Sequence, residues 1–167
     1  DPSAYTPPYD RALCAALARL DDLDVTLVTS RFQYGAVPEA TGYAVDERFY
    51  RHLLGGRSRF ASKLARHPVD MLRYRAHAHS QADVVHFQWL AVQPLDRFLL
   101  PPRPRVLTAH DLLPREPRPF QLRAQRRLYD AVDAVVAHSE YGRRRLVEDL
   151  GVPADRVRVI HHGAFDH

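Results

Sequence analysis

Lysine is nearly absent from this sequence: Lys63 is the only one among 24 basic residues, and the others are arginines. Arginine carries a planar fork of donors that suits phosphate or carboxylate, so the bias fits an anionic ligand. It also fits a GC-rich genome, because Ala, Arg, Val and Pro are all abundant. The formal net charge is only +4, and no recognition-helix or RNA-binding signature accompanies it, so we expect no nucleic-acid partner.

Cysteine occurs once, as Cys14, which excludes an internal disulfide. Its place on an apolar helical stripe predicts a small buried thiol. Long apolar runs are also missing, since nothing approaches the roughly 20 residues that span a bilayer, and no secretory leader begins the sequence. We therefore expect a cytoplasmic protein, with peripheral contact to the inner face of the membrane as an alternative.

Several catalytic motifs are absent too. There is no GxSxG nucleophile elbow and no HExxH metal motif, and Pro7 and Pro8 stand in the first loop where glycines would admit a pyrophosphate. His77 and His79 lie two apart on an expected helix and point to different sides. We expect no metal or other cofactor. Metal-dependent hydrolysis stays an alternative, because histidines from different strands could converge.

The length and pattern of the first half predict one domain with a sizeable core, because 46% of the 167 residues are hydrophobic. Apolar residues recur at helical spacing from Tyr9 to Leu20, and residues 24–30 read as a buried strand. After an irregular segment we expect helices over 46–54 and 58–80. Pro68 is expected to break or kink the second of them.

The second half alternates regularly between strand and helix patterns. Ser139 is a natural helix N-cap, and Gly151 is a natural stop for the same helix. Such alternation predicts an α/β fold with a doubly wound, mostly parallel sheet and helices on both faces, in which residues 1–11 form the first βα loop and the first strand is missing. The expected strands are 83–89, 105–110, 132–138 and 156–163, and the expected helices are 92–100, 120–131 and 140–150.

Histidines collect where these strands end. In open α/β sheets, ligands bind beyond the carboxyl ends of the strands, so the pattern predicts a polar cleft there. Hydrogen-bonded strand-end histidines without a ligand are the alternative. The residues in question are His86, His110 with Asp111, His138, His161 and His162.

Two basic stretches are also notable. Arg143, Arg144 and Arg145 stand near the start of an expected helix, the reverse of what the helix dipole prefers, which indicates either a nearby anion or a solvated face. Residues 56–80 carry a local net charge of +5 interleaved with apolar residues. That stretch is expected either to lie on an anionic membrane surface or lipid-linked substrate, or to pack as an ordinary amphipathic helix.

The sequence contains an ordered series of three segments: DVVHFQW, RVLTAHD and LYDAVDAVVAHSEYGRRRLVEDLGVPADRVRVIHHGAFD. This series resembles the N-terminal half of the GT4 family of glycosyltransferases. The resemblance is sharpest from Asp83 onward. It implies a Rossmann-like half of a GT-B fold over residues 1–163, with 164–167 starting the crossover to a C-terminal domain. It also implies a retaining, hexosyltransferase-type enzyme of carbohydrate biosynthesis that uses a nucleotide-sugar donor and a sugar or lipid-linked acceptor.

The resemblance assigns roles residue by residue. His110 matches a histidine that lines the cleft near the reacting sugar, and Asp111 is its neighbour; both are candidate catalytic residues. His86 and Gln88 match a strand-end pair that is often His-x-His. The first loop departs from the family, which commonly places two glycines there, so an acceptor-facing role is expected instead for its residues. The candidate substrate-binding residues are Tyr5, Thr6, Tyr9, His86, Gln88, Trp89, Ser139, Arg143 and Gly163.

The resemblance also implies a partner, the protein's own C-terminal domain, which in such enzymes holds most of the nucleotide-sugar site. We therefore expect this chain alone not to turn over. The alternative from another class is a non-catalytic α/β binding domain.

Overall fold

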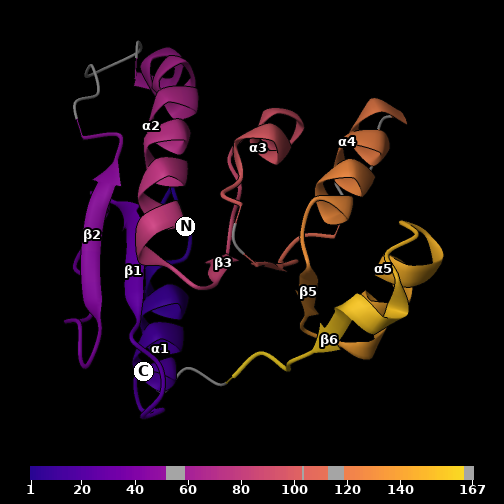
Figure 1. Cartoon of the computed structure of the whole chain (residues 1–167), viewed down its shortest axis with the longest axis horizontal. Helices are drawn as coiled ribbons and strands as arrows, with labels where there is room; N and C mark the ends of the chain where they lie inside the picture. The colour runs from indigo at the N-terminus through magenta and orange to yellow at the C-terminus, as the bar shows by residue number, and fades with distance from the viewer. Residues whose placement is uncertain (52–58, 103, 113–118, 164–167) are drawn as a thin grey trace. The chain divides into compact units, whose positions relative to one another are not determined.

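The computed structural model describes residues 1–51, 59–102, 104–112 and 119–163 (Figure 1). The chain divides into two compact units. Unit 1 comprises Asp1–Arg73 with Trp89–Ala91, and unit 2 comprises Tyr74–Gln88 with Val92–His167. The expected crossover over 164–167 lies outside the described residues.

Unit 1 begins with α1 (Pro7–Leu17), whose two prolines stand in the first turn, where a missing N–H removes no helical hydrogen bond. This helix packs on β1 (Thr26–Ser30), which pairs in parallel with β2 (Ala44–Phe49). Cys14 is buried on α1, as expected.

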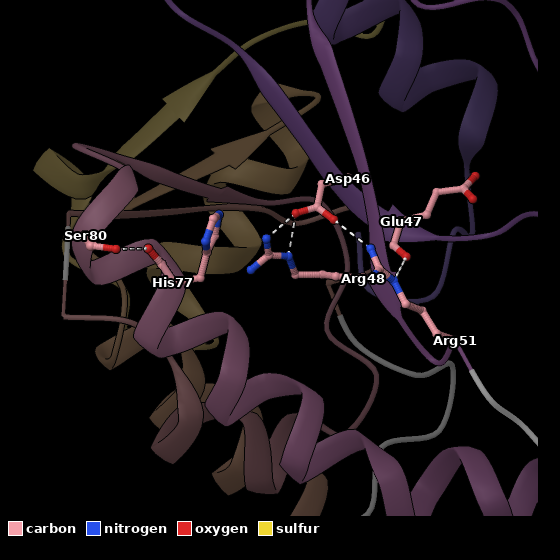
Figure 2. Close-up of polar contacts among 6 residues, drawn as sticks. All are labelled: Asp46, Glu47, Arg48, Arg51, His77 and Ser80. Carbon is pink, nitrogen blue, oxygen red and sulfur yellow. Dashed lines mark hydrogen bonds and ion pairs between the residues drawn. The ribbon is translucent and has the colours of Figure 1, made fainter.

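The helix expected over 46–54 is wrong, because residues 44–49 form strand β2, while residues 52–54 lie outside the described part of the chain. In a strand, side chains two apart share one face, and Arg48 Nε accordingly donates to the Asp46 carboxylate at 2.6 Å (Figure 2). Arg51 donates to Asp46 at 3.3 Å and to the Glu47 carbonyl at 2.7 Å. Arg48 and Arg51 therefore both pair with Asp46.

Helix α2 (Arg59–Gln81) continues through Pro68, so of the expected break or kink the break does not occur. Proline removes one helical hydrogen bond, and side chains buried on either side of it anchor the helix. The Tyr50 hydroxyl lies 2.6 Å from His67 Nδ1, and the Tyr50 backbone N–H donates to the Asp70 carboxylate at 2.9 Å. His67, Asp70 and the neighbouring Met71 are all buried.

Unit 2 holds a four-stranded parallel sheet in the order β3 (Val85–Phe87), β4 (Arg105–Thr108), β5 (Ala134–Ala137) and β6 (Val157–Val159). Successive strands are joined by α3 (Gln93–Leu99), α4 (Pro119–Asp130) and α5 (Glu140–Glu148), with a 3-10 turn at Ala154–Arg156 before β6 (Figure 1). Leu107 pairs with Phe87 on one side and Val135 on the other, and all are buried. The prediction of an α/β fold with parallel strands is confirmed.

The predicted ends of α5 are also confirmed. Ser139 is the N-cap, and its hydroxyl oxygen accepts a hydrogen bond from the Gly142 N–H at 3.0 Å. At the other end Gly151 adopts a φ of +71°, which a side chain would disfavour, and the Val152 N–H bonds back to the Leu146 carbonyl at 3.0 Å.

Replacing Ser139 with alanine should lower the free energy of unfolding by about 1 kcal/mol, because an N–H of the first helical turn loses its acceptor. Chemical denaturation measures the change. Ser139→Asp is the matched control, since aspartate caps equally well and should restore stability. An alanine variant as stable as the wild type would show that the cap contributes nothing.

Among the described helices, none combines the length and the apolar content needed to cross a membrane.

Candidate functional site

A chain of hydrogen bonds joins polar side chains at the carboxyl edge of β3 and β4 in unit 2. His86 and Gln88 share one face because they are two residues apart, and so do Thr108 and His110. His86 Nε2 lies 2.8 Å from the Thr108 hydroxyl and 3.2 Å from the Gln88 amide nitrogen. His110 Nε2 lies 3.1 Å from the Gln88 amide oxygen. The register of the two strands thus brings together three candidate residues, His86, Gln88 and His110, and adds Thr108, which reasoning from the sequence missed.

The donor and acceptor roles along this chain follow from its chemistry. An amide nitrogen only donates and an amide oxygen only accepts, so Gln88 donates to His86 Nε2 and accepts from His110 Nε2–H. The Thr108 hydroxyl then donates to His86 Nε2. His110 therefore carries its proton on Nε2 and its lone pair on Nδ1.

Both imidazoles are neutral at pH 7. Burial lowers the pKa of His86 to about 4. Burial, reinforced by the neighbouring His138, His162 and His86, likewise lowers the pKa of His110 to about 4. A group with so low a pKa is a poor general base, but its fixed lone pair can accept a hydrogen bond and orient a hydroxyl.

Two further histidines, His138 after β5 and His162 after β6, stand at the same edge. The His138 ring centroid lies 5.1 Å from that of His110 and 4.9 Å from that of His162. Both histidines were noted from the sequence as strand-end residues but were left out of the candidate site. Their shared signal was a position just beyond a buried parallel strand, and only the strand register shows that they converge. His161 is exposed and is not part of the group.

The remaining candidates of unit 2 take other positions. Asp111 is exposed, and Ser139 caps α5. Arg143 is half-buried on α5, and the Gly163 carbonyl accepts from His162 Nδ1–H at 3.2 Å.

Beside Arg143 on α5, the Arg145 side chain pairs with Asp149 at 2.6 Å. That pairing favours the interpretation of a solvated helical face over a bound anion.

Unit 1 brings together three other candidates. Trp89 Nε1–H donates to the Thr6 hydroxyl at 2.9 Å, and the Tyr5 and Trp89 rings meet edge to face with centroids 5.6 Å apart. The Asp1 carboxylate holds the loop by accepting the Tyr5 N–H at 2.6 Å. Tyr5 remains 57% exposed. Burial raises the pKa of Tyr9, which is half-buried on α1.

Two residues of unit 1 were missed by reasoning from the sequence. The single lysine, Lys63, places its ammonium 5.5 Å from the Tyr5 ring centroid and 4.8 Å from that of Tyr50. Asp10 is buried beside Thr6, whose hydroxyl donates to it at 3.5 Å, and burial raises the pKa of Asp10 to about 6. The rarity of lysine in the sequence could have pointed to Lys63. For Asp10 the sequence offers no signal beyond its place in the first turn of α1.

The comparisons with known proteins give one match. A family model described as Glycosyltransferase Family 4 matches residues 11–164. This range includes the strand-end residues from His86 to Gly163, whereas Tyr5, Thr6 and Tyr9 precede it. A search of the curated proteins finds no match to the chain.

Proposed function

The chain belongs to glycosyltransferase family 4, and from this premise we propose that it is the acceptor-side domain of an enzyme that transfers a sugar, with retention of configuration, from a nucleotide-sugar donor to an acceptor hydroxyl. The donor would bind mainly to a second, C-terminal domain of the same protein. The observation that supports the acceptor role is the Thr108–His86–Gln88–His110 chain, which fixes a neutral imidazole at the carboxyl edge of the sheet.

In this proposal His110 positions the acceptor. Its Nδ1 lone pair accepts a hydrogen bond from the acceptor hydroxyl and turns the oxygen toward the anomeric carbon. Retention without a placed carboxylate nucleophile implies a same-face displacement, in which the departing diphosphate takes the acceptor proton. The protein then contributes orientation and electrostatic stabilisation, and the reaction needs no metal ion.

The test is to offer the full-length gene product, with its proposed C-terminal domain, a panel of nucleotide sugars and acceptors. The proposal expects transfer from a nucleotide hexose that EDTA leaves undiminished. Nucleotide-sugar hydrolysis or transfer that disappears with EDTA would favour metal-dependent chemistry. Acceptor binding without any transfer would favour the non-catalytic binding domain.

We further propose that the Tyr5 ring, held by Trp89 and the Asp1 carboxylate, contacts the acceptor, because an exposed aromatic side chain suits a sugar ring. Tyr5→Ala should then raise the KM for the acceptor about 5- to 10-fold with little change in kcat, since it removes about 1 kcal/mol of stacking. Steady-state kinetics with varied acceptor measures this. Tyr34→Ala is the matched control, because Tyr34 lies in the same unit and its side chain is 80% exposed. Equal KM values for both variants would contradict the role.

A peripheral membrane contact through α2 is proposed from its exposed apolar side chains. Phe60, Leu64 and Leu72 are 77%, 47% and 52% exposed, and the exposed Arg73 side chain accompanies them on the helix. Apolar groups and arginines together suit the headgroup region of an anionic bilayer. A lipid-linked acceptor would be met at that surface.

Leu72→Ser should weaken binding to vesicles of anionic phospholipid about fivefold, as expected for losing about 1 kcal/mol of apolar burial. Co-sedimentation with anionic and with uncharged vesicles measures it. Leu20→Ser changes a leucine of similar exposure, 51%, outside α2 and should leave binding unchanged. Equal binding to both vesicle types would exclude the electrostatic part of the proposal.

A further inference from the structure

Three imidazoles from three adjacent strand ends converge in unit 2. His110 follows β4, His138 follows β5 and His162 follows β6, and these strands are parallel neighbours. One ring nitrogen from each lies within 4.8 Å of those of the other two. The strands' carboxyl ends all reach the same edge of the sheet, so the convergence follows from the fold.

Each imidazole also places one ring nitrogen within hydrogen-bond distance of a carbonyl oxygen. His110 Nε2 lies 3.1 Å from the Gln88 amide oxygen, His138 Nδ1 lies 2.9 Å from the Ile160 carbonyl, and His162 Nδ1 lies 3.2 Å from the Gly163 carbonyl. A carbonyl oxygen only accepts, so each of these nitrogens carries the proton. The lone pairs are consequently on His110 Nδ1, His138 Nε2 and His162 Nε2.

This is the arrangement that surrounds metal-ligating histidines, in which the second ring N–H donates to a carbonyl or carboxylate and so fixes the tautomer. We propose that His110, His138 and His162 together bind a divalent transition-metal ion, for which Zn²⁺ is the best fit. Three imidazole nitrogens select Zn²⁺, Ni²⁺ or Cu²⁺ over Mg²⁺ and Ca²⁺, which prefer oxygen ligands.

Little movement is needed to complete the site. In a tetrahedral Zn²⁺ site with bonds of about 2.0 Å, ligand nitrogens lie about 3.3 Å apart. The present ligand atoms lie within 4.8 Å of one another, so the proposed site would form by side-chain rotation, for which the exposed His162 has room. The fourth position is open to water or an anion.

This metal site plays no part in the proposed sugar transfer, which uses no metal ion, although the two functions share His110. A bound ion takes the lone pair that orients the acceptor hydroxyl, so metal binding and acceptor binding exclude each other. Metal binding itself is therefore the readout, and its outcome does not depend on whether the protein transfers sugar.

The experiment measures Zn²⁺ binding to untagged protein by competition with a chromogenic chelator, and bound metal after dialysis by mass spectrometry. The expected result is one tightly bound Zn²⁺ per chain and no comparable Mg²⁺ binding. His138→Ala and His162→Ala should each weaken Zn²⁺ binding at least about tenfold. His161→Ala is the matched control, because it removes the adjacent exposed imidazole and should bind as the wild type does.

The proposal is overturned if the wild type binds no stoichiometric Zn²⁺, or if the His138→Ala/His162→Ala double variant binds it as tightly. It is equally overturned if His161→Ala weakens binding as much as His162→Ala does. Circular dichroism verifies that each variant is folded. His162→Gln, at an exposed position, provides a second variant that keeps the side-chain bulk.

Discussion

Replacing His110 with alanine should lower the kcat of the full-length enzyme by about 10²- to 10⁴-fold while leaving nucleotide affinity nearly unchanged. The side chain is proposed to orient the acceptor hydroxyl, and a misplaced nucleophile loses most of the benefit of binding. Nucleotide affinity is spared because the donor is proposed to bind mainly to the C-terminal domain. Steady-state kinetics, together with calorimetric titration of the nucleotide, separates the two effects.

His161→Ala is the matched control for this experiment too, since it removes an exposed imidazole that is outside the hydrogen-bonded chain. Its kcat should equal that of the wild type. His110→Gln tests whether a hydrogen-bonding side chain of similar reach restores part of the rate. A His110→Ala enzyme with normal turnover contradicts the positioning role.

The wild-type protein should lose about 2 to 3 kcal/mol of stability relative to a His86→Gln variant as the pH falls from about 6.5 to about 4. Burial lowers the pKa of His86 in the folded protein to about 4, whereas the unfolded chain has the ordinary value near 6.5. Between these values the unfolded state binds the proton and the folded state does not. Acid therefore favours unfolding, and the stabilisation is fully present only above about pH 6.5.

Denaturant titrations of both proteins across this pH range measure the effect. Taking the difference between them cancels the groups that titrate alike in both proteins. The glutamine can still accept from Thr108, so the loss of an acceptor is minimised. Parallel pH profiles for the two proteins would show that His86 is not held neutral by burial.

The second half of the fold was predictable because its signals are local. The short apolar strand β5 (Ala134–Ala137) is followed by the N-cap of α5 at Ser139, and Gly151 stops that helix; these features need no distant partner. The first half was not. A helix was expected over 46–54, and only pairing with β1, which is not a neighbour in the sequence, makes residues 44–49 a strand. Pro68 stays within α2 because buried contacts anchor the helix around it.

The site divides in the same way. That His86 and His110 stand at strand ends follows from the sequence, because parallel strands present their carboxyl ends at one edge. The bridge through Gln88 and the convergence of His138 and His162 depend on the strand register, which the sequence does not specify. The hydrogen bond from Trp89 to Thr6 joins residues 83 apart, and no local pattern predicts it.

The central claim is that His110 positions an acceptor hydroxyl for a same-face sugar transfer. The most direct measurement is the anomeric configuration of the first product formed by the full-length enzyme, followed by NMR during the reaction. The proposal predicts that the new glycosidic bond keeps the configuration of the nucleotide-sugar donor, at a rate that falls sharply with His110→Ala and stays unchanged with His161→Ala. An inverted product, or a retained product formed equally fast by the His110→Ala enzyme, would contradict it.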